Sequence, residues 1–94
     1  MKIELVYFEG CPNVEEAREH LRVALAETRT QNGWAEWDTD RAETPESYRK
    51  YGSPTILVDD RDVGGGAEGG GRSCVVGGAP SVARIVAAIR ERPR

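Results

Sequence analysis

The stretch that most constrains the fold is Gly10-Cys11-Pro12, where a strand-like run ends and a helical pattern begins. Residues 2–8 alternate at first and then become continuously apolar, which is typical of a strand buried on both faces. Apolar side chains then recur at helical spacing over residues 12–29, and Pro12 suits the first helical position because its missing N–H costs nothing there. The sequence therefore predicts a β-strand followed directly by an α-helix.

The rest of the chain continues this alternation of strands and helices. We expect Arg29 in the last turn of the first helix, where a cation complements the helix dipole. The further predicted elements are a strand at 34–38, a short helix at 44–51, a strand at 55–58, a glycine-rich loop at 59–71, a strand at 72–76 and a helix at 80–91. This β-α-β-α-β-β-α order predicts one α/β domain over residues 1–94. Its first two strands should be parallel, and its last two should form an antiparallel hairpin.

Composition narrows the class of function. The 13 basic and 16 acidic residues are mixed along the chain, which argues against a nucleic-acid-binding face. The longest apolar runs are far shorter than a membrane span, and no signal-peptide pattern follows Met1. We therefore expect a cytoplasmic, monomeric protein whose two cysteines are free or transiently reactive.

Cys11 is the first candidate for chemistry. It is expected at the carboxyl end of a central strand and at the N-cap of a helix. Ligand and catalytic groups gather at such positions in open α/β sheets, and the positive helix end favours a thiolate. The acidic neighbours Glu9, Glu15 and Glu16 oppose that ionisation. The alternative is that Cys11 is only a small apolar residue at the start of a helix.

Two segments together resemble the thioredoxin-like family at glutaredoxin size. Cys11-Pro12 matches the first half of a Cys-Pro-x-Cys motif, and residues 52–58 match the segment in which a cis-proline precedes the third strand and faces the cysteine. Residues 77–82 are similar to a segment of small bacterial thioredoxin-like proteins, some of which are named after organomercurial or mercury-resistance loci. The resemblance implies a four-stranded mixed sheet in the order 2-1-3-4 with helices on both faces. It also implies a cis bond before Pro54 and substrate contacts from Pro12, Asn13, Ser53, Pro54 and Thr55.

The chain departs from the motif at Val14, where the resolving cysteine of the family would stand. Val14 should instead pack on the inward face of its helix. Cys74 is a possible second thiol, but the implied strand order puts it two strands from the first, roughly 9–10 Å away laterally. A disulfide needs Cα atoms within about 7 Å, so a preformed Cys11–Cys74 bridge is not expected. Two cysteines and the single His20 do not make a zinc site, and no metal or bound cofactor is expected.

Three functions remain open from the sequence. The first is a monothiol thiol-disulfide oxidoreductase, in which Cys11 forms mixed disulfides with glutathione, another small thiol or a protein thiol, and an external thiol resolves them. The second is a module without turnover that binds a soft metal ion or a peptide partner. The third is a degenerate fold with a structural role only.

Overall fold

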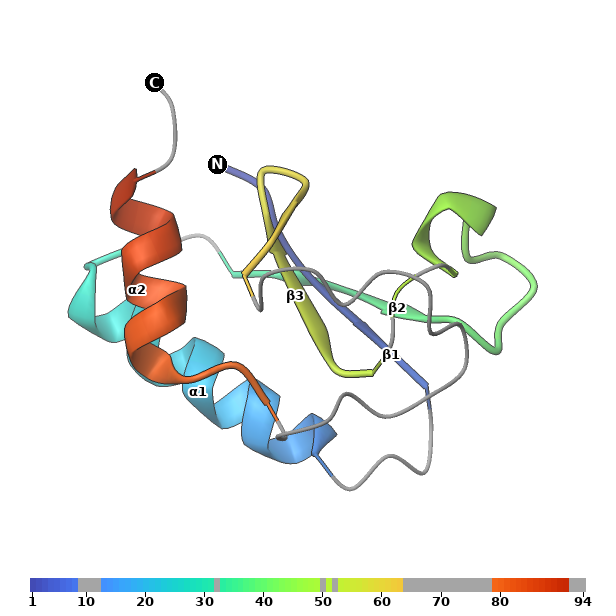
Figure 1. Cartoon of the computed structure of the whole chain (residues 1–94), viewed down its shortest axis with the longest axis horizontal. Helices are drawn as coiled ribbons and strands as arrows, with labels where there is room; N and C mark the ends of the chain where they lie inside the picture. The colour runs from blue at the N-terminus through green and yellow to red at the C-terminus, as the bar shows by residue number, and fades with distance from the viewer. Residues whose placement is uncertain (9–12, 32, 50, 52, 64–78, 92–94) are drawn as a thin grey trace.

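The computed structural model describes residues 1–8, 13–31, 33–49, 51, 53–63 and 79–91 (Figure 1). The described chain is an α/β fold with one four-stranded mixed sheet and two α-helices. Its elements in chain order are β1 (Ile3–Tyr7), α1 (Val14–Glu27), β2 (Ala35–Asp38), the 3-10 helix η1 (Glu46–Tyr48), β3 (Thr55–Val58), β4 (Arg61–Asp62) and α2 (Val82–Glu91).

The strands lie in the order β2-β1-β3-β4, which confirms the predicted 2-1-3-4 order and the parallel pairing of the first two strands. β3 is antiparallel to β1, with Val6 opposite Thr55, and it is antiparallel to β4. The fourth strand is not the predicted one, because residues 61–62 fall within the predicted loop. Asp59 and Asp60 both have positive φ, as in the tight type I′ turns of β-hairpins, so the chain turns back directly after β3. The predicted strand at 72–76 lies outside the described residues.

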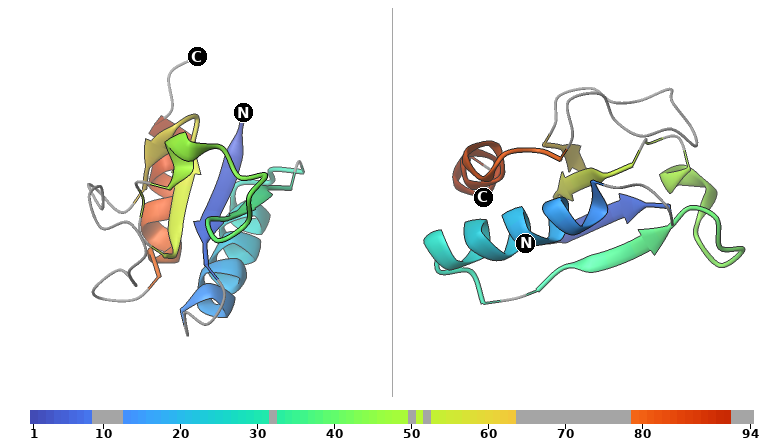
Figure 2. Two further views of the ribbon diagram at one scale, coloured as in Figure 1. Left: turned by 90° about the vertical axis from the view of Figure 1, so that its right-hand side faces the viewer. Right: turned by 90° about the horizontal axis from the view of Figure 1, so that it is seen from below.

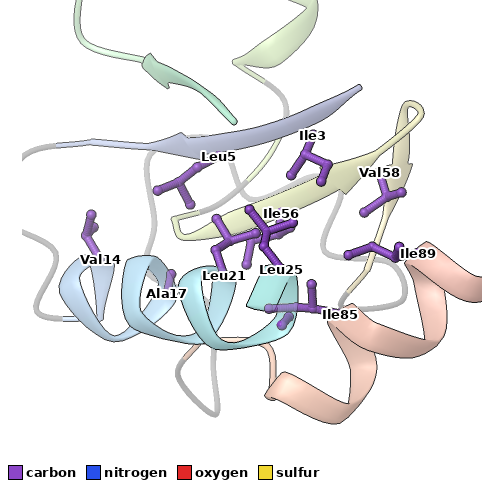
Figure 3. Packing of buried hydrophobic residues seen from close by; sticks show 11 residues of the cluster. Ile3, Leu5, Val14, Ala17, Leu21, Leu25, Ile56, Val58, Ile85 and Ile89 are labelled. Atoms are coloured by element: carbon purple, nitrogen blue, oxygen red, sulfur yellow. The ribbon is translucent and has the colours of Figure 1, made fainter. Parts of the chain in front are cut away.

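Both α-helices pack on one face of the sheet, and the short 3-10 helix η1 packs on the other face, so a single turn meets the expectation of helices on both faces there (Figure 2). The main core lies between this face and the helices (Figure 3). It consists of the buried side chains Ile3, Leu5, Val14, Ala17, Leu21, Ala24, Leu25, Ile56, Val58, Ile85 and Ile89. β1 contributes its odd-numbered residues to this core because successive side chains of a strand point to opposite faces.

The opposite face of the sheet has a smaller core formed by Val6, Leu57 and Tyr51, against which Trp37 and Tyr48 pack. Tyr48 belongs to η1, so a single 3-10 turn takes the place of an α-helix here. The predicted helix over 44–51 is thus reduced to three residues.

The Thr44 hydroxyl donates a hydrogen bond to the Asp38 carbonyl. Pro45 is the residue that precedes the 3-10 turn.

The α1 boundaries also differ from the prediction of 12–29. The helix begins at Val14 with Asn13 as its N-cap, so the expectation that Cys11 is the N-cap is wrong. At the other end Thr28 is the C-cap, and Arg29 follows it with a φ of 54°. The Arg29 N–H donates to the Ala26 carbonyl and the Thr30 N–H to the Leu25 carbonyl, at 3.3 and 2.9 Å. This is the Schellman motif, with arginine at the left-handed position that glycine usually occupies.

Candidate functional site

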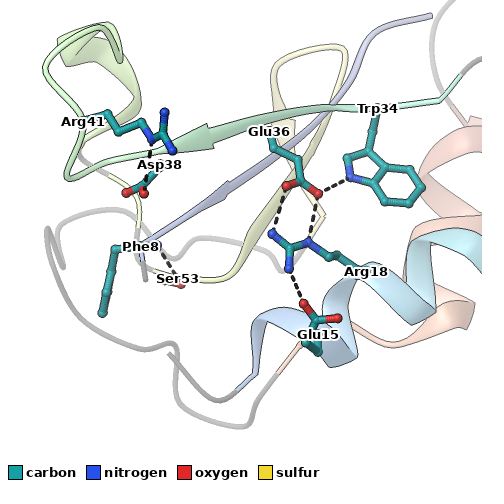
Figure 4. A network of polar contacts seen from close by, with 8 residues as sticks. All are labelled: Phe8, Glu15, Arg18, Trp34, Glu36, Asp38, Arg41 and Ser53. Carbon is teal, nitrogen blue, oxygen red and sulfur yellow. Dashed lines mark hydrogen bonds and ion pairs between the residues drawn. The ribbon is translucent and has the colours of Figure 1, made fainter. Parts of the chain in front are cut away.

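The candidate site is the edge of the sheet where β1 ends, β3 begins and α1 starts. Because β3 runs antiparallel to β1, its first residues lie beside the last residues of β1. The Phe8 backbone N–H donates a hydrogen bond to Ser53 Oγ at 3.3 Å, joining residues 45 positions apart in the chain (Figure 4). The carboxyl end of β1 is thus held against the Ser53-Pro54-Thr55 segment.

The proline segment has the predicted backbone form. The Ser53–Pro54 peptide bond is cis, which confirms the expectation. The side chains of Ser53, Pro54 and Thr55 are almost fully buried, at 1% exposure for Ser53 and Thr55. These three residues therefore belong to the buried interior beside the carboxyl end of β1.

Cys11, Pro12 and Cys74 lie outside the described residues, so the predicted separation of the two cysteines is not tested. In the sequence, Cys11 stands three residues after Phe8 and two residues before Asn13. Asn13 is half-buried, and its side chain makes no capping hydrogen bond to the first turn of α1.

Val14 is buried on the inward face of α1 with Ala17 and Leu21, as predicted. An isopropyl group that is 7% exposed in an apolar core fills space there and offers no nucleophile. Position 14, where a Cys-Pro-x-Cys motif would have its second cysteine, is therefore occupied in this chain by a side chain that packs in the core.

Arg18 forms a polar cluster beside this edge that sequence reasoning missed (Figure 4). Its guanidinium binds the Glu36 carboxylate of β2 through two hydrogen bonds, from Nε at 3.0 Å and from Nη2 at 2.9 Å. It also contacts Glu15 one turn earlier on α1, and it lies 5.3 Å from the centroid of the Tyr7 ring. The spacing of Glu15 and Arg18 predicts their contact, but only the packing of α1 on the sheet brings Glu36 to Arg18.

The charges in this cluster stabilise one another. Hydrogen bonding to Arg18 holds the pKa of Glu36 below its usual value, and the Trp34 indole N–H, 2.9 Å from Glu36 Oε2, acts in the same direction. Hydrogen bonding to Glu36, and less strongly to Glu15, raises the pKa of Arg18. Glu36 and Arg18 are therefore both charged at neutral pH.

Two other α1 side chains hold the segment that precedes α2. The Ala79 N–H donates to Glu16 Oε1 at 3.3 Å. The His20 Nδ1 lies 2.7 Å from the Pro80 carbonyl oxygen and must be the donor, because a carbonyl can only accept. His20 is half-buried, and its hydrogen bond to Pro80 connects α1 to the segment that precedes α2.

A cavity of about 240 Å³ lies beside the edge, at the carboxyl end of β2. It is polar, and its lining residues are Tyr7, Glu36, Trp37, Asp38, Arg41, Glu43 and Thr44. Its volume is slightly below the usual range for small-molecule sites.

Within the part of the chain that the structure describes, no three His, Cys, Asp or Glu side chains are grouped so as to hold a metal ion. No helix in the same residues is long and apolar enough to cross a membrane. No known family pattern, curated protein sequence or solved structure matches this chain.

Proposed function

We propose that this chain is a monothiol thioredoxin-like protein in which Cys11 exchanges disulfides with a small thiol or a protein thiol. The Cys11 thiolate attacks one sulfur of a disulfide such as oxidised glutathione. The disulfide breaks, one half leaves as a thiolate, and the other half becomes joined to Cys11. A second thiol then attacks this mixed disulfide and releases Cys11 as a thiolate.

The observation that carries the proposal is the hydrogen bond between the Phe8 N–H and Ser53 Oγ. It ties the end of β1, from which the chain leads to Cys11, to the buried segment containing the cis Ser53–Pro54 bond. Cys11 is also only two residues from Asn13, a separation of at most about 7 Å between Cα atoms. The short connections from Phe8 to Cys11 and from Cys11 to Asn13 limit how far Cys11 can lie from the ends of these two elements, and this supports the proposal.

The start of α1 favours a thiolate. A helix of 14 residues carries a partial positive charge at its N-terminus, and the backbone N–H groups of its first turn can donate to an anion. The Asn13 side chain does not compete for them. Of the acidic residues that oppose ionisation, Glu15 is paired with Arg18, and Glu16 accepts from Ala79.

An external thiol is needed for the second step because the local position is Val14, which is buried in the core and carries no sulfur. This favours a one-cysteine cycle over the two-cysteine cycle of a dithiol motif. Glutathione or another small thiol is the expected reductant.

The test measures alkylation of Cys11 by iodoacetamide against pH, together with mass spectrometry after incubation with oxidised glutathione. We expect an alkylation midpoint below the value of about 8.5 for a free cysteine. We also expect one glutathione adduct on Cys11, which dithiothreitol releases. The matched variants are Cys11→Ser, which should lose the adduct, and Cys74→Ser, which should keep it.

A midpoint at or above that of free cysteine, with no adduct, would overturn the proposal. The rival proposal of a soft-metal module makes a different prediction. It requires tight one-to-one binding of Hg²⁺ that is lost in both Cys11→Ser and Cys74→Ser.

A further inference from the structure

A cavity of about 280 Å³ lies between the β3–β4 hairpin and α2. Figure 3 shows α2 beside this end of the sheet, where it contacts β3. Val58, the last residue of β3, lines the cavity and pairs with Ile3 at the start of β1. The cavity is therefore at the opposite end of the sheet from the candidate site, and it is independent of the proposed thiol chemistry.

The hairpin gives the cavity an apolar floor and one cation. Val58 is 2% exposed, and Val63 packs against the main core. Residues directly opposite each other in an antiparallel pair have their side chains on the same face of the sheet. Arg61 is opposite Val58, so its side chain lies on the helix side. Asp62 is opposite Leu57, which belongs to the other core, so its carboxylate lies on the far side.

The wall that α2 contributes is one stripe of the helix. Its residues are spaced three and four positions apart and lie one above another, and they are Arg84, Ala87, Ala88 and Glu91. The two alanines leave open the space that larger side chains would fill. The arginine and the glutamate stand at the two ends of the stripe, about 10 Å apart along the helix axis.

The charges on the helix side of this cavity do not balance. Arg61 and Arg84 supply two cations, and Glu91 supplies one anion. Among the residues that the structure describes, no carboxylate forms an ion pair with either arginine. A planar guanidinium can donate two parallel hydrogen bonds to a carboxylate, so both arginines suit an anion. The surplus of one positive charge favours a singly charged ligand over a doubly charged one.

We infer that this cavity binds a small monocarboxylate with an aliphatic body. The aliphatic chain packs on Val58, Val63 and Ala88, where burial removes apolar surface from water. The carboxylate accepts hydrogen bonds from Arg61 and Arg84, which are exposed at the mouth. The volume is slightly below the usual range for small-molecule sites, which excludes a drug-sized ligand and favours a short acid.

The experiment titrates the full chain, kept reduced, with sodium hexanoate at pH 7 and follows the backbone amides by two-dimensional NMR. Hexanoate should shift the amides of Val58, Val63 and Ala88 until they saturate. Hexanamide has the same body without the charge, and hexylamine has the opposite charge. Both should bind about ten-fold more weakly, because neither meets the two arginines as an anion. Inorganic phosphate, which has no apolar body, should shift these amides less than hexanoate does.

Variants of the two arginines test the charged contact. Arg61→Gln and Arg84→Gln should each weaken hexanoate binding by about three- to five-fold and leave hexanamide binding unchanged. The matched control is Arg90→Gln, which removes the same charge from the same helix at a side chain that lines a different hollow of the surface. It should change the hexanoate affinity by less than about two-fold, because an exposed charge at a distance is screened.

A variant of the stripe tests the apolar contact. Ala88→Leu fills the space beside α2 and should abolish the saturable shifts with hexanoate, while far-UV circular dichroism shows that the helices are retained. The surface variants of the arginines decide the question if Ala88→Leu does not fold.

Three results would overturn the inference. They are the absence of saturable shifts with hexanoate, an equal affinity for hexanoate and hexanamide, and arginine variants that bind no more weakly than Arg90→Gln. Shifts that gather away from the cavity would count in the same way. None of these results bears on the glutathione adduct of Cys11, so the proposed function is tested separately.

Discussion

The Trp37 indole N–H on β2 donates a hydrogen bond to Glu4 Oε2 on β1 at 2.8 Å, on the sheet face opposite the helices. The Tyr48 hydroxyl donates to the same oxygen, and the Trp37 and Tyr48 rings stack with centroids 5.0 Å apart. The Glu4 side chain is 3% exposed, and its other oxygen, 3.7 Å from Lys2 Nζ, accepts no hydrogen bond from the described residues. A buried carboxylate therefore organises this face and attaches the η1 segment to the sheet.

Replacing Glu4 should destabilise the fold strongly. Glu4→Ala leaves the Trp37 and Tyr48 donors without their acceptor and opens a cavity, at a cost of about 2–4 kcal/mol in the free energy of unfolding. Glu4→Gln keeps one acceptor oxygen and should cost about half as much. Urea unfolding followed by tryptophan fluorescence measures both. Glu19→Ala, on the exposed side of α1, is the control, and a Glu4→Ala loss no larger than that of the control would contradict this account.

Tyr48 should make stability fall at alkaline pH. Hydrogen bonding to Glu4 raises the pKa of Tyr48 above its usual value of 10, so the folded state favours the protonated phenol. This contribution is fully present below the unfolded pKa and is lost as the pH rises through the folded pKa. Unfolding free energies measured between pH 9 and 11.5 should decline less steeply in Tyr48→Phe. Identical slopes in the two proteins would show that this hydrogen bond does not contribute.

The contribution of Glu36 to the free energy of unfolding should be lost at acidic pH. Its pKa is lowered by Arg18, so its contribution is present above the unfolded pKa and is lost as the pH falls through the folded pKa. Glu36→Gln should therefore cost about 1 kcal/mol at pH 7 and little at pH 3. Chemical unfolding at the two pH values checks this difference, and an equal cost at both would rule it out.

Arg29→Gly should stabilise the protein. Arg29 occupies the left-handed C′ position of the Schellman motif at the end of α1, which glycine adopts without a Cβ penalty. We expect a gain of about 0.5–1 kcal/mol, visible as a higher thermal midpoint. Arg22→Gly, in the interior of the same helix, should lose about 1 kcal/mol. Both variants remove one arginine, so opposite signs would identify backbone conformation as the cause, and a loss in both would refute the prediction.

Ser53→Ala should loosen the edge at which Cys11 is proposed to act. It removes the acceptor of the Phe8 N–H in a buried position, which should cost about 1–2 kcal/mol in unfolding free energy. Amide hydrogen exchange at Phe8 should become faster in this variant. Ser47→Ala, at an exposed position in η1, is the control and should change neither quantity.

Several elements could be read from the sequence because local pattern and burial agree in them. The apolar run of β1, the helical spacing of α1 and the four-residue β3 were predicted close to their observed bounds. The parallel pairing of β1 with β2 follows from a strand-helix-strand order, and the inward position of Val14 follows from helical periodicity. These features depend on residues near one another in the chain.

The tertiary structure decided what depends on contacts between distant segments. The packing of α2 beside α1 put both α-helices on one face of the sheet. Glu4 is buried only because Trp37 and Tyr48 supply its donors, 33 and 44 positions away.

The same distinction between local patterns and long-range contacts applies to the candidate site. The sequence by itself pointed to Cys11 through the strand-to-helix junction, while the Ser53-Pro54-Thr55 segment was implied by the resemblance to the thioredoxin-like family. The fold brought Phe8 to Ser53 and Arg18 to Glu36, because those contacts form only when β3 lies against β1 and α1 packs on the sheet.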